Sequence, residues 1–362
     1  AMFGPSATTF SSLSVTMVAI SMMVSLSGLR PVISRSIQIR FSVLGMAASL
    51  TKRYARAALM NASFDARVIA VFGRNLLVRD RSGRELEART FGKRLTVVCG
   101  DEVRCEPDAR HGEIHVVEGL PRASALYRSN ARGGSEPIVA NLSRLLIVLA
   151  PRPAPDLFVV DRYISAAESA NVKPILVLNK CELEVEEELR RELDAITETG
   201  YPPLSCSVKT GLGIEALLQA CSGEVSALVG QSGVGKSSLV KRLVPEAEIT
   251  IGALARDDEG KHTTTTSRMF DLPLGGQLID SPGVRDFAPA IAQLEERYLG
   301  FIEVERLAAN CRFGDCKHLR EPGCAVRTAA ESGGMHPRRY ESYRRLRRLY
   351  EDLTEARGPG KK

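Results

Sequence analysis

Hydrophobic positions change their spacing along this chain of 362 residues. From Arg67 to about Arg128, short runs rich in β-branched and apolar residues, such as RVIAVF, NLLVRD and ELEARTF, are separated by turn residues. Runs of this length with frequent turns are typical of short strands. We therefore predict a small all-β barrel over residues 64–140. Five-stranded barrels often bind oligonucleotides on one face, but a purely structural barrel fits the pattern equally well.

Beyond residue 141 the apolar runs become continuous and alternate with charged segments. LLIVLA at 145–150 and PILVL at 174–178 are typical of strands buried on both faces, which occur in parallel sheets. The segment from Glu182 to Glu198 has apolar residues at helical spacing, and Val225–Val229 has the pattern of a further strand. This alternation predicts an α/β domain over residues 141–289.

Residues 290–362 are more polar and end in a long segment with helical spacing. Pro337 can begin a helix in which one stripe is apolar and aromatic. That stripe contains Tyr340, Tyr343, Leu346 and Tyr350, and arginines lie elsewhere around the helix at Arg338, Arg344, Arg345 and Arg348. Contact with nucleic acid phosphates and a solvated helix face explain these arginines equally well.

The first 63 residues contain no aspartate or glutamate, and we expect them to be a disordered extension of unknown role. The run Val15–Leu29 is interrupted by serine and threonine and follows no lysine or arginine, so we predict neither a secretory signal nor a membrane span. An organellar transit peptide and a wrongly assigned start upstream of Met46 would both leave this composition.

Composition narrows the class of protein only slightly. A formal net charge of +6 permits an anionic partner without requiring one. The eight cysteines are scattered rather than arranged as a disulfide framework, which indicates a reducing compartment.

The strand at 225–229 is followed by a complete GxxxxGKS sequence. Its residues are Gly230, Gln231, Ser232, Gly233, Val234, Gly235, Lys236 and Ser237, with Ser238 next. In such a loop backbone N–H groups surround the β-phosphate, the lysine offsets charge on the β- and γ-phosphates, and the serine hydroxyl ligates Mg²⁺. We predict a nucleoside triphosphate site, with Lys236 contributing to catalysis.

Two further segments follow the phosphate loop. Asp280-Ser-Pro-Gly283 ends the strand Gln277–Ile279, where a carboxylate can hold the Mg²⁺ shell and the glycine amide can sense the γ-phosphate. The intervening sequence Gly260-Lys-His-Thr-Thr-Thr-Thr266 predicts a mobile loop in which Thr264 or Thr265 completes the Mg²⁺ coordination. A solvated threonine-rich loop without a ligand role is the alternative.

Two sequences typical of guanine recognition come before the phosphate loop. Asn179, Lys180, Cys181 and Glu182 resemble the NKxD motif, and Ser207, Val208 and Lys209 resemble the SAK element. In Ras-like GTPases both elements come after the phosphate loop. A circular permutation explains the reversed order without changing the site in space, because termini that lie close together can be joined and the chain reopened elsewhere.

A third cluster, Cys311-x4-Cys316-x-His318-x5-Cys324, has the composition of a structural zinc site. Three thiolates and one imidazole supply four tetrahedral ligands and leave no open position. Such a site would hold together a segment that is otherwise too polar to fold. Three reduced cysteines beside an unrelated histidine are the alternative.

The permuted order, together with GQSGVGKSS, GKHTTTT, DSPGVRDF and the Cys/His cluster, resembles the RsgA (YjeQ) family of bacterial small-subunit ribosome biogenesis GTPases. The resemblance covers residues 67–350 and implies an OB-fold barrel, a circularly permuted GTPase domain and a C-terminal α-helical zinc-binding domain over 290–362. It also implies late maturation of the small ribosomal subunit, rRNA binding and ribosome-stimulated hydrolysis of GTP to GDP and phosphate.

The resemblance further implies that His262 helps to position the attacking water. Val284 follows DxxG where Ras-like enzymes have their water-orienting glutamine, and a valine cannot orient water. The sequence departs from the family pattern at Glu182, where an aspartate is usual, and in the first 63 residues. Because Asp280 to Asp286 leads directly into the zinc segment, movement of this switch is a candidate cause of tilting between the zinc domain and the barrel.

Two other classes of protein remain open: a P-loop ATPase or kinase, and a non-catalytic RNA-binding protein that holds nucleotide as a structural ligand. A kinase would have no use for guanine motifs, and a non-catalytic protein would bind GTP without turnover. We expect a monomer that binds GTP or GDP with Mg²⁺, carries one structural zinc ion, and contacts the small ribosomal subunit but no membrane. We expect it in the cytoplasm, or in an organelle if the extension is a transit peptide.

Overall fold

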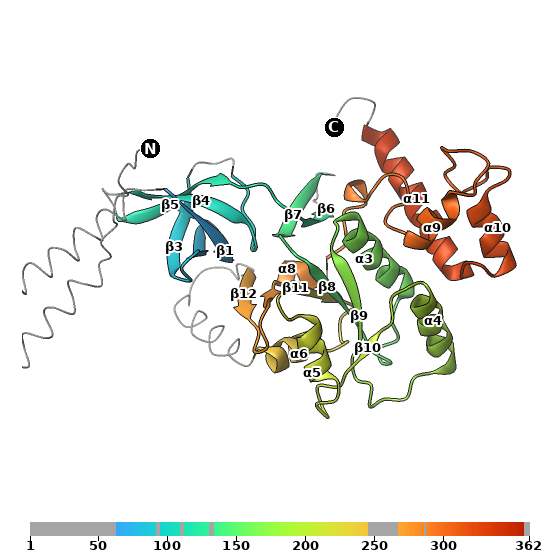
Figure 1. Ribbon diagram of the computed structural model, residues 1–362, viewed down its shortest axis with the longest axis horizontal. Coiled ribbons are helices and arrows are strands. Elements are labelled where there is room, and N and C mark those ends of the chain that lie inside the picture. Colours follow the sequence, from blue (N-terminus) through green and yellow to red (C-terminus); the bar gives the residue numbers. More distant parts are fainter. Residues whose placement is uncertain are drawn as a thin grey trace, which may run out of the picture. The chain divides into compact units, whose positions relative to one another are not determined.

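The structure is a computed structural model that describes residues 63–91, 95–108, 112–129, 134–244, 267–285 and 287–357. The expected extension lies outside the described residues apart from Ser63, and so do His262, Thr264, Thr265 and Asp286. Within the described part, one sheet of eleven strands continues from a barrel into a mostly parallel sheet (Figure 1). The two hydrophobic spacings of the sequence correspond to these two parts.

Five strands form the barrel. They are β1 (Phe64–Phe72), β2 (Asn75–Asp80), β3 (Glu85–Thr90), β4 (Glu102–Asp108) and β5 (Glu113–Gly119). They pair in the order β1-β2-β3-β5-β4, and β4 pairs again with β1 to close the barrel. Residues that alternate along the strands fill its interior, including the fully buried Val68, Val78, Val103 and Val116. The predicted all-β barrel is confirmed.

The strands β6 (Ala125–Ser129) and β7 (Ser135–Ala140) do not belong to the barrel. They form a separate antiparallel hairpin, and the backbone N–H of Ala290 donates to the carbonyl of Tyr127 at 2.9 Å. The expectation that the barrel extends to residue 140 is therefore wrong: its last strand ends at Gly119. Alternation of apolar residues identifies a strand, but it does not specify the strand with which it pairs.

The second part of the sheet is parallel except for one strand. Its strands are β8 (Arg144–Leu149), β9 (Lys173–Leu178), β10 (Leu204–Ser205), β11 (Val225–Gly230), β12 (Ser267–Asp271) and β13 (Gln277–Asp280). They lie in the order β10-β9-β8-β11-β13-β12, and β12 is antiparallel to β13. The continuous apolar runs at 145–150 and 174–178 are β8 and β9, so the predicted α/β architecture is confirmed.

Helices cover both faces of this parallel sheet, which explains why its strands are apolar on both sides. One face packs against α3 (Leu157–Ser169) and α4 (Glu187–Glu198) through residues such as Ile164 and Ile196. The other face packs against α5 (Ile214–Ala220) and α6 (Lys236–Leu243) through Leu217 and Leu239.

The strand β1 joins the barrel to the parallel sheet. Its first four residues pair with β4, whereas Ala70 and Val71 pair with Arg268 and Ser267 of β12. The register of β1 against β2 shifts between Val68 and Ala70. Such an irregularity bends a strand and increases its twist, which lets one strand pair both within the barrel and with β12.

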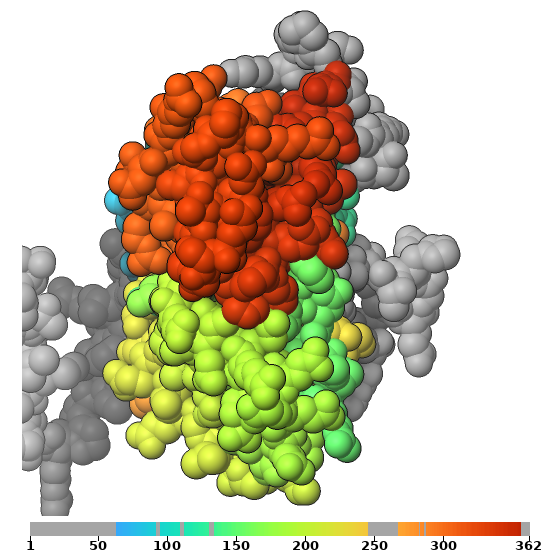
Figure 2. Space-filling view, turned by 90° about the vertical axis from the view of Figure 1, so that its right-hand side faces the viewer, coloured from blue at the N-terminus to red at the C-terminus, as the bar shows by residue number. Residues whose placement is uncertain are grey.

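The chain after the sheet is helical. It contains α8 (Pro282–Arg285), the short 3₁₀ helix η2 (Ile291–Gln293), α9 (Ile302–Ala308), α10 (Ala325–Ser332) and α11 (Pro337–Arg357). This segment, orange to red in Figure 2, lies directly against the segment that contains α3 and α4. Its own core includes Phe301, Val304, Val326 and Tyr343. None of the helices in the described ranges is long and apolar enough to cross a bilayer.

A buried ion network joins α3, α9 and α11. Arg339 is 1% exposed, and its guanidinium lies 2.8 Å from a carboxylate oxygen of Asp161 and 2.6 Å from one of Glu303. The hydroxyl of Ser342 donates to Asp161 at 2.6 Å, and Arg338 also pairs with Asp161. Burial opposes the charge on Arg339, but Asp161 and Glu303 outweigh that effect and raise its pKa. The network therefore holds α11 to the parallel sheet through α3.

We predict that Arg339→Leu lowers the free energy of unfolding by about 3–5 kcal/mol, because the carboxylates of Asp161 and Glu303 would stay buried without their partner. Urea denaturation followed by circular dichroism measures this loss. Arg348→Leu is the matched control, because Arg348 is exposed on the same helix, and we expect it to change stability by less than about 0.5 kcal/mol. Equal stabilities of the two variants would contradict a stabilising role for the network.

Candidate functional site

The phosphate loop connects β11 to α6, as predicted. The ammonium group of Lys236 lies 2.7 Å from the carbonyl oxygen of Gly230 and 2.8 Å from that of Gln231, so the side chain folds back over its own loop. Gly235 has a φ of 97°, and a Cβ there would collide with the side-chain amide of Asn179. The loop therefore requires glycine at this position both for its backbone conformation and for space.

The first guanine motif touches the phosphate loop directly. The amide of Asn179, buried at the end of β9, donates to the carbonyl of Val234 at 2.9 Å. Lys180 donates to the carbonyl of Gly233 at 2.7 Å and to that of Arg152 at 2.9 Å. The structure thus brings NKCE and GxxxxGKS together, although they are about 50 residues apart in the sequence.

The second guanine motif lies beside the first. The hydroxyl of Ser207 is hydrogen-bonded to the Glu182 carboxyl group, and this bond keeps the pKa of Glu182 below its usual range. The positive charges of Lys209 and Lys180 act in the same direction. Ser207 is fully buried, whereas Glu182 is exposed. An ionised, solvent-exposed carboxylate is therefore held beside the second motif at neutral pH.

The DSPG segment approaches the phosphate loop from the other side of β11. Asp280 ends β13, which pairs with β11 in parallel, and its side chain is 9% exposed. Arg285 of α8 donates to both oxygens of Asp280, from Nε at 2.7 Å and from Nη2 at 2.5 Å. The Nη1 of the same guanidinium donates to the hydroxyl of Ser237 at 2.7 Å.

Sequence reasoning missed Arg285. A basic residue two positions after DxxG is the only sign of it in the sequence, and its partners become visible only when α8 turns the side chain towards Asp280 and Ser237. The same contacts test whether Mg²⁺ fits this place. One guanidinium bridges the two side chains expected to hold the metal, so their oxygens already converge on a cation, and hard oxygen ligands are those that Mg²⁺ prefers. The residues present therefore fit Mg²⁺.

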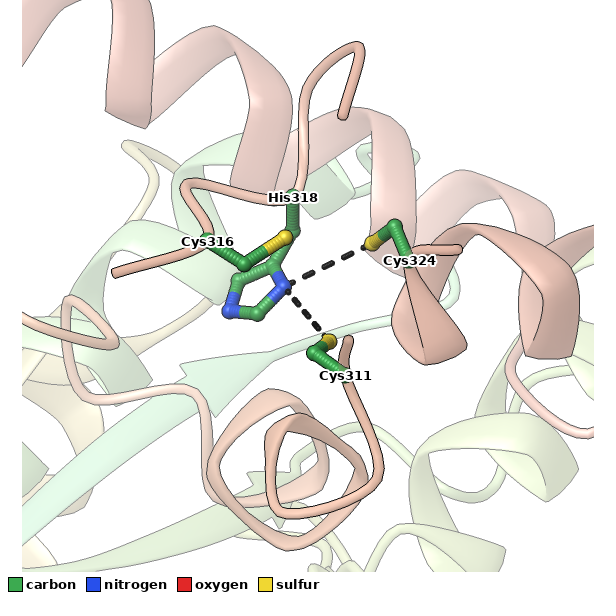
Figure 3. Close-up of side chains that lie close together, drawn as sticks. All are labelled: Cys311, Cys316, His318 and Cys324. Atoms are coloured by element: carbon green, nitrogen blue, oxygen red, sulfur yellow. Dashed lines mark hydrogen bonds between the residues drawn. The ribbon is translucent and has the colours of Figure 1, made fainter. Parts of the chain in front are cut away.

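The four residues of the predicted zinc cluster come together. The ligand atoms of Cys311, Cys316, His318 and Cys324 all lie within 4.8 Å of one another. In Figure 3 the imidazole lies among the three cysteines, and its Nδ1 is 3.5 Å from the Sγ atoms of Cys311 and Cys324. Sulfur atoms around tetrahedral zinc are about 3.8 Å apart, so the cluster has the size that a metal ion requires.

The protonation of His318 suits metal binding, whereas the cysteines become ligands only when a cation is present. Burial lowers the pKa of His318, assisted by the charge of Arg347, which keeps the imidazole neutral as a metal ligand must be. Burial raises the pKa of the Cys316 thiol to about 12. A cation is therefore needed to stabilise the thiolate forms inside this cluster.

Four loops at the carboxyl ends of β9, β10, β11 and β13 thus form one site, which is where open α/β sheets bind ligands. The strands that carry the guanine motifs lie on one side of β11, and the DSPG strand lies on the other. His262, Thr264 and Thr265 fall outside the described residues, so their expected roles stay predictions. The fold and the order of the motifs define a P-loop GTPase that is circularly permuted.

Comparisons with known proteins agree with this class. Residues 119–289 match a family model described as RsgA GTPase. The small ribosomal subunit biogenesis GTPase RsgA of Azotobacter vinelandii is 44% identical over 289 residues, 77% of this chain and 83% of the relative. The protein of the same name from Pseudomonas aeruginosa strain LESB58 is 43% identical over 284 residues, with the same shares of both chains. The chain belongs to the RsgA family.

Solved structures show the same fold. YjeQ from Thermotoga maritima is 26% identical and covers 80% of this chain and 99% of its own, with a TM-score of 0.61. YloQ, described as a circularly permuted GTPase, is 21% identical and covers 83% of this chain and 98% of its own, with a TM-score of 0.62. The latter supports the fold alone.

We predict that Cys316→Ser releases most of the metal bound to the purified protein, because one of four ligands is lost from a closed site. Metal analysis by mass spectrometry of wild type and variant measures the stoichiometry. Cys181→Ser makes the same chemical change at a half-buried cysteine outside the cluster and should keep the full metal content. Full metal content in Cys316→Ser would remove Cys316 from the ligand set.

Proposed function

We propose that this protein hydrolyses GTP to GDP and phosphate and acts in the biogenesis of the small ribosomal subunit. The activity follows from the family, whose curated relatives are named small ribosomal subunit biogenesis GTPases. The observation that carries the proposal is the direct contact of Asn179 and Lys180 with the phosphate loop. This contact supports a single site for guanine recognition and phosphate binding.

In this proposal the guanine base lies against Asn179, Lys180, Cys181 and Glu182 on one side and Ser207, Val208 and Lys209 on the other. The carboxylate of Glu182 accepts hydrogen bonds from N1–H and the N2 amino group of guanine, which adenine cannot offer. Ser207 holds this carboxylate from the side away from solvent. Its position explains why GTP would be preferred to ATP.

The phosphates lie on the loop from Gly230 to Ser238. Lys236 leaves the carbonyl oxygens of Gly230 and Gln231 to contact the β- and γ-phosphates, and the amide of Gly283 senses the γ-phosphate. Ser237 and Thr264 or Thr265 would hold Mg²⁺, with Asp280 supporting its shell; bound Mg²⁺ would neutralise phosphate charge. His262 would position the attacking water, as the family resemblance implies. Val284 is 1% exposed and has no polar group, so it cannot take that role.

The finer parts of the proposal concern the remaining surfaces. The Cys/His cluster would hold one structural zinc ion, which fits its three sulfur ligands and one nitrogen ligand. Contact with rRNA would use exposed arginines of the barrel, such as Arg81, Arg84 and Arg89, each of which also pairs with a carboxylate, or the exposed Arg348 of α11. Arg338 of α11 is occupied by Asp161 and Glu192, and Arg344 and Arg345 both pair with Glu341. The chain would act as a monomer in the cytoplasm, or in an organelle if residues 1–63 are a transit peptide.

GTP turnover with and without purified small ribosomal subunits tests the proposal. We expect the wild type to be stimulated by the subunits and Lys236→Ala to lose hydrolysis almost completely, since the γ-phosphate would lose its main cationic partner. Lys241→Ala removes an exposed lysine from the same helix and should keep turnover near the wild-type value. Turnover of Lys236→Ala within a few-fold of wild type would remove the phosphate loop from the mechanism. GTP binding without turnover by the wild type would favour the non-catalytic alternative, and equal turnover of ATP would favour the ATPase.

We predict that Glu182→Asp tightens GTP binding several-fold. Glutamate offers the same two charge-assisted bonds as aspartate, each worth about 1.5–3 kcal/mol, but its extra rotatable bond adds an ordering cost of up to ~2 kcal/mol. Fluorescence titration with GTP and ATP measures both affinities, and Glu184→Asp is the control at an exposed neighbour. Weaker GTP binding by Glu182→Asp would show that the site is built around glutamate, and equal binding of GTP and ATP by the wild type would exclude guanine recognition.

A further inference from the structure

The guanidinium of Arg285 forms a fork that closes the gap between Asp280 and Ser237. It donates to both carboxylate oxygens of Asp280 and, through its third nitrogen, to the hydroxyl of Ser237. Bidentate pairing of this kind is among the strongest hydrogen bonding that a carboxylate forms. Asp280 is nearly buried, and the guanidinium satisfies both of its oxygens without any other cation.

The backbone around Arg285 holds the guanidinium in this place. The N–H groups of Val284 and Arg285 donate to the carbonyl of Ser281 at 2.9 and 3.0 Å, which closes the single turn of α8. Val284 is buried in the apolar core beneath the turn. The side chain of Arg285 therefore starts from a fixed backbone, and it reaches across to Ser237, which is 48 residues away in the sequence.

We propose that Arg285 is a built-in substitute for the metal ion: it fills the Mg²⁺ position while the nucleotide site is empty and must leave when Mg²⁺ and nucleotide bind. This inference rests on the proposed GTP site. The metal would be held by the hydroxyl oxygen of Ser237 and supported by the carboxylate of Asp280. These are the groups to which the guanidinium of Arg285 donates hydrogen bonds. Two cations cannot share these oxygens without strong repulsion, so each arrival of Mg²⁺ requires Arg285 to withdraw.

Two consequences follow for the switch segment. The free site does not leave Asp280 as a buried, unpaired carboxylate, which would be costly. In addition, Mg²⁺ binding is coupled to displacement of the side chain that follows DxxG, because the guanidinium and the metal compete for the Ser237 oxygen beside Asp280. Arg285 is therefore a positioning residue whose effect on the nucleotide is transmitted through the metal site.

The alternative position for Arg285 is in the outer shell of bound Mg²⁺, where it would orient Asp280 towards the metal. The two arrangements predict opposite signs. If Arg285 competes with Mg²⁺, its removal lowers the Mg²⁺ concentration needed to retain nucleotide. If Arg285 supports the metal from outside, its removal raises that concentration.

The experiment measures the dissociation rate of mant-GDP from the full-length protein as a function of Mg²⁺ concentration. We expect Arg285→Ala to reduce the half-saturating Mg²⁺ concentration several-fold relative to wild type. Arg285→Lys keeps the positive charge but cannot form the bidentate hydrogen bonds of a guanidinium. It should shift the half-saturating Mg²⁺ concentration in the same direction but by less. Arg306→Ala, an exposed arginine of α9, is the control for loss of one positive charge and should leave the value unchanged.

Circular dichroism of each variant checks that it folds, and Arg285→Lys carries the test if Arg285→Ala does not. An unchanged or increased Mg²⁺ requirement in the folded variants would overturn the inference while leaving the GTP site intact. Failure of the wild type to bind mant-GDP at any Mg²⁺ concentration would overturn the proposed function, and the inference with it.

Discussion

The parallel pairing of β8, β11 and β13 is the constraint on which the site depends. Strands that run in the same direction end at the same edge, so the loops that follow β9, β10, β11 and β13 must meet there, whatever their order in the sequence. The chain can therefore be opened at a different loop without moving any side chain of the site. Circular permutation changes only the connections of the GTPase domain, that is, which other domain precedes it and which follows it in the chain.

The buried ion network restricts how the helices after the sheet can move relative to the GTPase domain. Asp161 of α3 is held by two arginines and a serine of α11, and Glu303 completes the network from α9. A network of this kind is costly to open in part, because each remaining charge would stay buried. Movement of the segment that contains the Cys/His cluster relative to α3 is thus opposed where α11 packs against α3. The tilting expected from the connection after Asp280 would have to occur with α3 and α11 moving together.

Local patterns in the sequence were sufficient for the phosphate loop, the parallel strands and the Cys/His cluster, because each depends on residues close together in the chain. Contacts between distant segments could not be predicted from local sequence patterns. Strand β6 lies in the β-rich part of the sequence that predicts the barrel, and only its pairing with β7 separates it from the barrel. In the sequence, Arg339 is one of many arginines of a polar segment, and Arg285 is a charged residue after a motif. The roles of these two arginines follow from their burial and from their partners in distant segments of the chain.

The shared strand β1 gives the barrel an unusual attachment. Ala70 and Val71 pair with Arg268 and Ser267 at the start of β12, and Ser267 in turn lies 2.6 Å, hydroxyl to hydroxyl, from Ser281 beside Asp280. The barrel thereby covers β12, the edge strand of the parallel part of the sheet. That edge is not left open to association with other chains. The barrel is attached to the parallel part of the sheet by backbone hydrogen bonds between β1 and β12, not by a flexible linker alone. Whatever binds to its outer surface is therefore positioned relative to β12, whose first residue, Ser267, contacts Ser281 beside Asp280.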